Sequence, residues 1–95
     1  MKSKNDIKVC DYARNISISL RKKAGIRQQD LGDFLGISRT AMVNIEAGRQ
    51  NLSASMIYIL ACLYNVEIAY FFPKKRKVKL ATEEVKVKII KQIEL

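Results

Sequence analysis

Four residues that tolerate a left-handed backbone divide most of this chain into short helical segments. Gly25, Gly36 and Gly48 each follow a stretch with helical periodicity, and Asn65 follows another. Glycine, and after it asparagine, readily adopts the left-handed conformation that closes an α-helix. We therefore expect an all-α fold, with helices at about 7–24, 28–35, 39–47 and 54–64.

Each predicted helix carries apolar residues at the spacing that makes one buried face. The first helix offers Tyr12, Ile16, Leu20 and Ala24. The later helices offer Leu31, Phe34 and Leu35, then Met42 and Ile45, then Met56, Ile59, Leu60 and Leu63. A short fifth helix at about 67–72 is expected to end before Pro73, because the residue that precedes proline disfavours the helical conformation.

The C-terminal segment fits two conformations. The alternation of apolar and charged residues in VKVKI suits a strand. A helix starting at Thr82 would instead carry an apolar stripe made of Val85, Ile89, Ile90 and Ile93. We favour the helix, so the expected organisation is one helical domain at 1–73 and a basic linker with an amphipathic segment at 74–95.

The charge balance limits the partners of the chain. In 95 residues, 18 Lys and Arg against 9 Asp and Glu give a net charge of +9. Such an excess favours a polyanionic partner, either nucleic acid or an acidic membrane surface. A chain of this length forms one small domain with a single core, so a large enzyme cleft is not expected.

The two cysteines and the lack of histidine exclude several kinds of chemistry. Cys10 and Cys62 match no metal-binding spacing, and the chain contains no histidine. We therefore expect no metal site, no cofactor and no Cys–His nucleophile, and hence no enzyme. The longest apolar run is too short to cross a bilayer, and the N-terminus lacks the apolar core of a signal peptide. A cytoplasmic protein with reduced thiols is expected.

The most informative stretch is QQDLGDFLGISRTAMVNIEAGR, at residues 28–49. Gly32 supplies a small residue where two short helices cross, and Gly36 ends the first helix and forms the turn between them. Their interface is expected to contain Leu31, Leu35, Ile37, Met42 and Ile45. With a helix-turn-helix at about 28–47, the chain strongly resembles the phage-repressor type, the Cro/CI-like (XRE) family with a five-helix lambda repressor-like domain. The resemblance extends over about residues 12–72, including IEAGR and NVEIAYFF.

The resemblance implies a structural role for two charged residues. Arg21 and Glu46 stand where similar repressors form an ion pair that ties the first helix to the third. The alternative is that both are solvated charges. The sequence also departs from the family, because Gly32 replaces the usual alanine and Val43 replaces a residue that is commonly polar.

The third helix is expected to contact DNA bases from its exposed N-terminal end. Arg39 can donate two hydrogen bonds to guanine, and Asn44 can pair with adenine through both ends of its amide. Thr40 can bond to a base or touch a thymine methyl group. Val43 either meets a thymine methyl group or packs near the second helix.

A second set of polar residues is expected to hold phosphates and fix the register on DNA. Gln28 begins the second helix, where the family's matching glutamine bonds a phosphate and where unpaired N–H groups attract an anion. By resemblance, the loop after Gly48 faces the DNA backbone. The expected phosphate contacts are Gln28, Ser38, Arg49, Gln50 and Asn51.

The basic run PKKRKVK, at residues 73–79, admits three interpretations. It is similar to a nuclear import signal, it can contact phosphates without specificity, or it connects the domain to an association segment. We favour the connector, because members of the family commonly dimerise from this end of the domain. The expected dimer or partner face comprises Phe71, Phe72, Val85, Ile89, Ile90 and Ile93.

Together these features predict a homodimeric regulator of transcription on a two-fold operator in double-stranded DNA, with half-sites about 10 bp apart. A phage-type repressor, a restriction-modification controller and an autoregulating antitoxin are all compatible with the sequence. A rival from another class is a protein-interaction module whose residues 74–95 bind a partner such as a toxin. Membrane binding is not expected, because that segment lacks tryptophan and phenylalanine.

Overall fold

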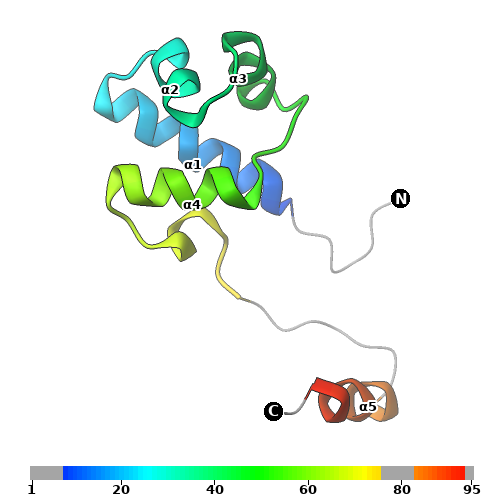
Figure 1. The fold of residues 1–95 in the computed structure, drawn as a ribbon. Helices are drawn as coiled ribbons and strands as arrows, with labels where there is room; N and C mark the ends of the chain where they lie inside the picture. The colour runs from blue at the N-terminus through cyan, green and yellow to red at the C-terminus, as the bar shows by residue number, and fades with distance from the viewer. Residues whose placement is uncertain (1–7, 76–82, 94–95) are drawn as a thin grey trace.

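The computed structural model describes residues 8–75 and 83–93, and all regular structure in those residues is helical (Figure 1). The elements are, in order, α1 (Val9–Ala24), α2 (Gln28–Leu35), α3 (Arg39–Glu46), α4 (Ala54–Tyr64), the 3-10 helix η1 (Ile68–Phe71) and α5 (Glu83–Ile93). The predicted all-α fold is confirmed, and residues 83–93 form a helix rather than a strand. Thr82 and most of the basic run lie outside the described residues.

Left-handed residues end three of the helices at the predicted places. Gly25, Gly36 and Asn65 have φ values of 70°, 75° and 53° and close α1, α2 and α4. α3 ends slightly earlier than expected, at Glu46, so that the left-handed Gly48 (φ 85°) lies within the following loop. The turns are therefore tight, and they hold successive helices close to each other.

Serine side chains begin α3 and α4. Ser38 Oγ accepts a hydrogen bond from the backbone N–H of Ala41 at 3.0 Å, and Ser53 Oγ accepts one from the N–H of Met56 at 3.1 Å. Each bond satisfies one of the donors that a helix leaves unpaired at its start. Ser38 thus fixes the first turn of α3, which is also the exposed end of that helix.

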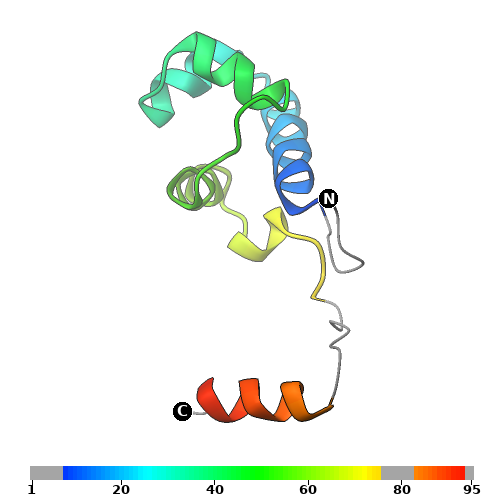
Figure 2. The same cartoon turned by 90° about the vertical axis from the view of Figure 1, so that its right-hand side faces the viewer.

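The core lies where α1, α4 and η1 meet the pair formed by α2 and α3 (Figures 1 and 2). Its buried apolar residues are Ala13, Leu31, Met42, Ile45, Ile57, Leu60, Ala61 and Phe71. Leu35 and Ile37, also expected between the helices of the helix-turn-helix, are partly buried against this cluster. The expectation that Phe34 joins the buried face is wrong, because this residue is 55 % exposed. The same holds for four other residues assigned to buried faces, which are all exposed: Tyr12, Ala24, Ile59 and Leu63.

Gly32 allows α2 and α3 to cross at close range. A Cβ atom at this buried position would lie 3.2 Å from the carbonyl oxygen of Ile37 and 3.5 Å from Cβ of Met42. The glycine that replaces the family's usual alanine therefore sits at the crossing itself. The close approach comes with a loss of about 1 kcal/mol in helix propensity relative to alanine.

The predicted fifth helix is a 3-10 helix, and one expectation that depended on it is wrong. Its backbone bonds run from the N–H of Tyr70 to the carbonyl of Glu67 (2.9 Å) and from the N–H of Phe72 to that of Ala69 (3.1 Å). Phe71, expected on a dimer or partner face, is fully buried where η1 meets α1 and α4, whereas Phe72 is 36 % exposed. Adjacent side chains leave a short helix in different directions, so only one of the two phenylalanines enters the core.

α5 lies away from the other helices in both views (Figures 1 and 2). Its apolar residues Val87, Ile89 and Ile90 are 50 %, 43 % and 51 % exposed. The side chains of Val85 and Ile93 lie outside the description. None of the helices in the described part of the chain has the length and hydropathy needed to span a bilayer.

Ser17 is a buried polar residue of α1, and it provides a test of the core. It is 1 % exposed, and its Oγ has no hydrogen-bond partner among the described residues. Burying an unpaired hydroxyl costs roughly 1–3 kcal/mol. We therefore expect Ser17→Ala to raise the free energy of unfolding, measured by urea denaturation, by about 1 kcal/mol more than a control at an exposed serine.

The control is Ser19→Ala, because Ser19 is exposed on the same helix. It gains only the higher helix propensity of alanine, about 0.5 kcal/mol. If Ser17→Ala proved the less stable of the two variants, the buried hydroxyl would be a stabilising group.

Candidate nucleic-acid interface

One carboxylate ties three parts of the chain together. Glu46, at the end of α3, accepts hydrogen bonds from Arg21 of α1, at 2.7 Å from Nε and at 2.9 Å from a terminal nitrogen. Gln28, at the start of α2, donates its side-chain amide to Glu46 at 2.8 Å. The other terminal nitrogen of Arg21 donates to the carbonyl oxygen of Ile26 at 2.8 Å. The Arg21–Glu46 ion pair implied by the resemblance is present, and its side chains are only 12 % and 8 % exposed.

The surroundings of this ion pair are shielded from water. Two parallel bonds between a guanidinium group and a carboxylate form a strong, directional contact. Burial raises the pKa of the nearby Tyr64 phenol, on which the charges of Arg21 and Glu46 act in opposite directions. Hydrogen bonds between charged groups are stronger where water is excluded, so the network fixes the orientation of α3 relative to α1 and α2.

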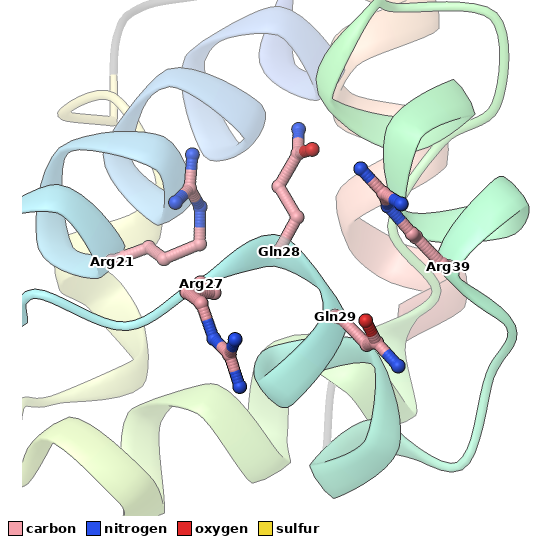
Figure 3. A pocket seen from close by; sticks show the side chains of 5 residues that line it. All are labelled: Arg21, Arg27, Gln28, Gln29 and Arg39. Atoms are coloured by element: carbon pink, nitrogen blue, oxygen red, sulfur yellow. The ribbon is translucent and has the colours of Figure 1, made fainter.

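A polar cavity of about 450 Å³ opens beside the network (Figure 3). Its lining residues are Arg21, Arg27, Gln28, Gln29 and Arg39. Gln28 lies between the guanidinium groups of Arg21 and Arg39 (Figure 3). Arg21 and Arg27 are paired with Glu46 and Asp30, whereas no carboxylate of the described residues pairs with Arg39. Among the described residues no side chain caps α2, so the backbone N–H groups of its first turn add to the charge of Arg39. A cavity of this composition attracts an anion.

Two residues of the cavity, Arg27 and Gln29, are missed by the sequence reasoning. The signal that could have found them is their position on either side of Gln28, at the predicted start of α2. Arg27 donates to Asp30 at 2.8 and 3.1 Å, and this hydrogen bond lowers the pKa of Asp30. The pair is exposed and therefore weak, so a phosphate can replace Asp30 as the partner of Arg27.

The residues expected to contact bases lie on two successive turns of α3. Arg39 and Thr40 lie on its exposed first turn, and Val43 and Asn44 are half-buried one turn further on. Ser38 is exposed as well, but a lone pair of its hydroxyl is already used in the helix cap. Arg39 and Thr40 are therefore the most accessible of the four residues.

The loop after α3 is bonded directly to Asn44. Arg49, Gln50 and Asn51, which are expected to contact phosphates, are all exposed. Asn44 Oδ1 accepts a hydrogen bond from Arg49 Nε at 3.1 Å. Its backbone carbonyl accepts bonds from the N–H groups of Arg49 (2.9 Å) and Gln50 (3.3 Å). The structure thus joins a residue expected to contact a base to the loop expected to contact the DNA backbone.

Sequence comparisons match the part of the chain that contains these elements. The profile of a family described as helix-turn-helix matches residues 18–71. The competence pilus inhibition repressor of Acinetobacter baylyi is 36 % identical over 53 residues, which cover 56 % of this chain and 48 % of that protein. The matched residues thus span about half the length of this relative.

A solved structure has a similar fold. The restriction-modification controller protein C.AhdI from Aeromonas hydrophila superposes with a TM-score of 0.55 at 25 % sequence identity. The superposition covers 67 % of this chain and 91 % of the controller. The likeness therefore includes nearly the whole of the controller, and it confirms the fold expected from the sequence.

The Glu46 network predicts a large loss of stability from one isosteric substitution. Glu46→Gln keeps the shape of the side chain but leaves the mostly buried guanidinium group of Arg21 without its counter-charge. Breaking a buried ion pair on one side costs about 3–5 kcal/mol. We expect the lower end, about 3 kcal/mol, in the free energy of unfolding from urea denaturation, because part of the pair is exposed.

Asp30→Asn is the matched control, since it removes the counter-charge of an exposed arginine, Arg27. This change is expected to leave the free energy of unfolding nearly unchanged. Similar small losses in the two variants would contradict a structural role for the Arg21–Glu46 pair.

Proposed function

The chain belongs to the XRE-type helix-turn-helix family of DNA-binding transcriptional regulators, and we propose that it binds double-stranded DNA with sequence specificity. The observation that carries the proposal is the position of α3. Its N-terminal end is exposed, its C-terminal end is fixed to α1 and α2 through Glu46, and it adjoins an arginine-lined cavity. A helix held in this way can enter the major groove while its surroundings bind phosphates.

In this proposal the first turn of α3 meets the base edges. Arg39 donates two hydrogen bonds to guanine, and Thr40 bonds to a base or touches a thymine methyl group. Val43 and Asn44 contact bases one turn further on, through the parts of their side chains that remain exposed. The exposed positions of Arg39 and Thr40 support this assignment.

Phosphates are held on both sides of α3. On one side, Gln28 uses one amide hydrogen for Glu46 and keeps the other for a phosphate, beside Arg27 and Gln29. Ser38, exposed at the start of α3, is a further proposed phosphate contact. On the other side, the loop of residues 49–51 is exposed and bonded to α3. Contacts of this kind fix the register of the protein on DNA but carry no sequence information.

We further propose a homodimer on a two-fold operator whose half-sites lie about 10 bp apart. The exposed residues Val87, Ile89 and Ile90 of α5 support self-association, because an amphipathic helix gains stability when a second apolar surface covers it. In this proposal residues 74–95 are a linker and association segment. The same exposed stripe favours the second candidate, a protein-interaction module whose tail binds a partner.

One relative is named a competence pilus inhibition repressor, and the solved structure is a restriction-modification controller protein. The second name supports one of the three settings considered for the sequence, whereas the first supports repression without matching any of the three. We propose that this chain regulates transcription as well. A regulator of this kind acts in the cytoplasm.

Selection of duplexes from a random DNA library tests the proposal. The full-length protein is incubated with the library, and bound duplexes are sequenced after successive rounds. We expect an inverted repeat with half-sites about one helical turn apart. Binding that weakens with salt but enriches no motif would contradict sequence-specific recognition.

Arg39→Ala is expected to weaken the preference at one base pair of each half-site, a loss of about 1–3 kcal/mol in discrimination between bases.

Arg27→Ala is the matched control, because Arg27 lines the same cavity and carries the same charge. This variant is expected to weaken binding to all duplexes alike and to reduce the salt slope by about 1. Identical profiles from the two variants would show that Arg39 contacts no base.

If the exposed stripe of Val87, Ile89 and Ile90 on α5 forms the proposed dimer interface, a polar substitution in it weakens the dimer. Ile90→Ser removes an apolar side chain that is 51 % exposed. Since burial of such a side chain contributes roughly 1.5–3 kcal/mol, we expect the dissociation constant from sedimentation equilibrium to rise at least tenfold. Gln92→Ser, at an exposed polar position of the same helix, is expected to leave it unchanged. A monomeric chain that associates only with a different protein would favour the interaction module.

A further inference from the structure

Three hydrogen bonds join Asn44 to the two residues that follow Gly48. The side-chain Oδ1 of Asn44 accepts one from Nε of Arg49 at 3.1 Å. Its backbone oxygen accepts the other two, from the N–H groups of Arg49 at 2.9 Å and Gln50 at 3.3 Å. Arg49 therefore holds Asn44 by both its main chain and its side chain.

The loop that carries Arg49 starts at a left-handed glycine beside α1. Gly48 has a φ of 85°, which side chains other than glycine rarely adopt, and a Cβ atom added there would lie 2.7 Å from a terminal nitrogen of Arg14. Arg14 itself donates a hydrogen bond to Asp11 at 2.9 Å. The left-handed turn at Gly48 leads Arg49 back to the end of α3, where its backbone N–H bonds to Asn44.

The bond from Arg49 fixes the orientation of the Asn44 side-chain amide, with Oδ1 towards Arg49 and Nδ2 away from it. An amide that pairs with adenine uses both ends, since Oδ1 accepts from N6 and Nδ2 donates to N7. In this structure Oδ1 faces Arg49 and already accepts a bond, so the Nδ2 donors are turned away from the loop. A group that offers mainly donors matches a base edge with acceptors, and guanine presents two, O6 and N7.

We propose that Arg49 is a positioning residue that sets the base preference of Asn44, by fixing its amide so that Asn44 selects guanine. The inference rests on the proposed DNA-binding function. It replaces the expectation that Asn44 pairs with adenine through both ends of its amide. The terminal nitrogens of Arg49 take no part in the bond to Asn44, so they remain for a phosphate.

Arg49→Lys separates the two roles of Arg49. Lysine keeps the positive charge near the DNA backbone, but it has a methylene group where arginine has Nε. The variant therefore loses the donor to Asn44 while it keeps an electrostatic phosphate contact. Gln50→Ala is the control for base preference, because Gln50 bonds to Asn44 only through its backbone N–H. As a proposed phosphate contact, Gln50 is expected to affect binding to all duplexes alike, so its loss leaves the base preference unchanged.

The test uses the selected operator and all its single-base variants, with the full-length protein at fixed salt. Asn44→Ala identifies the base pair that Asn44 contacts. At that pair the wild type is expected to prefer guanine, and Arg49→Lys is expected to reduce this preference by roughly tenfold. Binding of Arg49→Lys to operators changed at other base pairs, and the salt slope of that binding, are expected to change little. In the Asn44→Ala background, Arg49→Lys is expected to have no further effect on base preference.

Three results would overturn the inference: a preference that survives Arg49→Lys unchanged, an adenine preference in the wild type at the Asn44 position, or no loss of preference in Asn44→Ala. A wild-type protein that enriches no motif at all would instead overturn the proposed function.

A second measurement, made without DNA, complements the binding data. The side-chain NH₂ resonances of Asn44 are expected to shift in the ¹⁵N–¹H spectrum of Arg49→Lys but not in that of Gln50→Ala, and unchanged resonances in both would count against the bond.

Discussion

The carboxylate of Glu46 accepts hydrogen bonds from segments that come together only in the folded chain. Arg21 lies 25 residues before it and Gln28 lies 18 residues before it. Because the ion pair is mostly buried, it strongly favours one arrangement of α1, α2 and α3. Arg21 and Gln28, but not Glu46, also line the polar cavity, so the interaction that fixes α3 also shapes the place where an anion can bind. Stability and the proposed DNA contacts therefore depend on one network.

Much of the fold could be predicted because it depends on local rules. Glycine, asparagine and serine mark the helix ends, and the apolar spacing of the helix-turn-helix identifies the buried Leu31, Met42 and Ile45. Phe71 and Phe72 could not be distinguished, because which of two adjacent phenylalanines enters the core depends on the direction in which η1 meets α1 and α4. Arg27 and Gln29 could have been found from their positions beside Gln28, whereas the Arg49–Asn44 bond could not, since it depends on where two side chains meet in space.

Apolar and polar contacts have different roles in this structure. Apolar side chains and the small residue Gly32 bring the helices together, whereas the polar network determines how α3 is presented. The loop after α3 belongs to the polar part, because Arg49 and Gln50 bond to Asn44 rather than extending freely into solvent. α5 stands outside this arrangement and offers an exposed apolar stripe, which suits a role in association rather than in base contact.

In the proposed function α3 and its neighbouring loops, and not the basic C-terminal segment, recognise DNA. This can be tested by mapping ¹⁵N–¹H chemical-shift changes in the full-length protein while it is titrated with the selected operator at near-physiological salt. We expect the largest changes at the start of α2, in the first turn of α3 and in the loop of residues 49–51. Largest changes in α5, with α3 unaffected, would contradict the proposal.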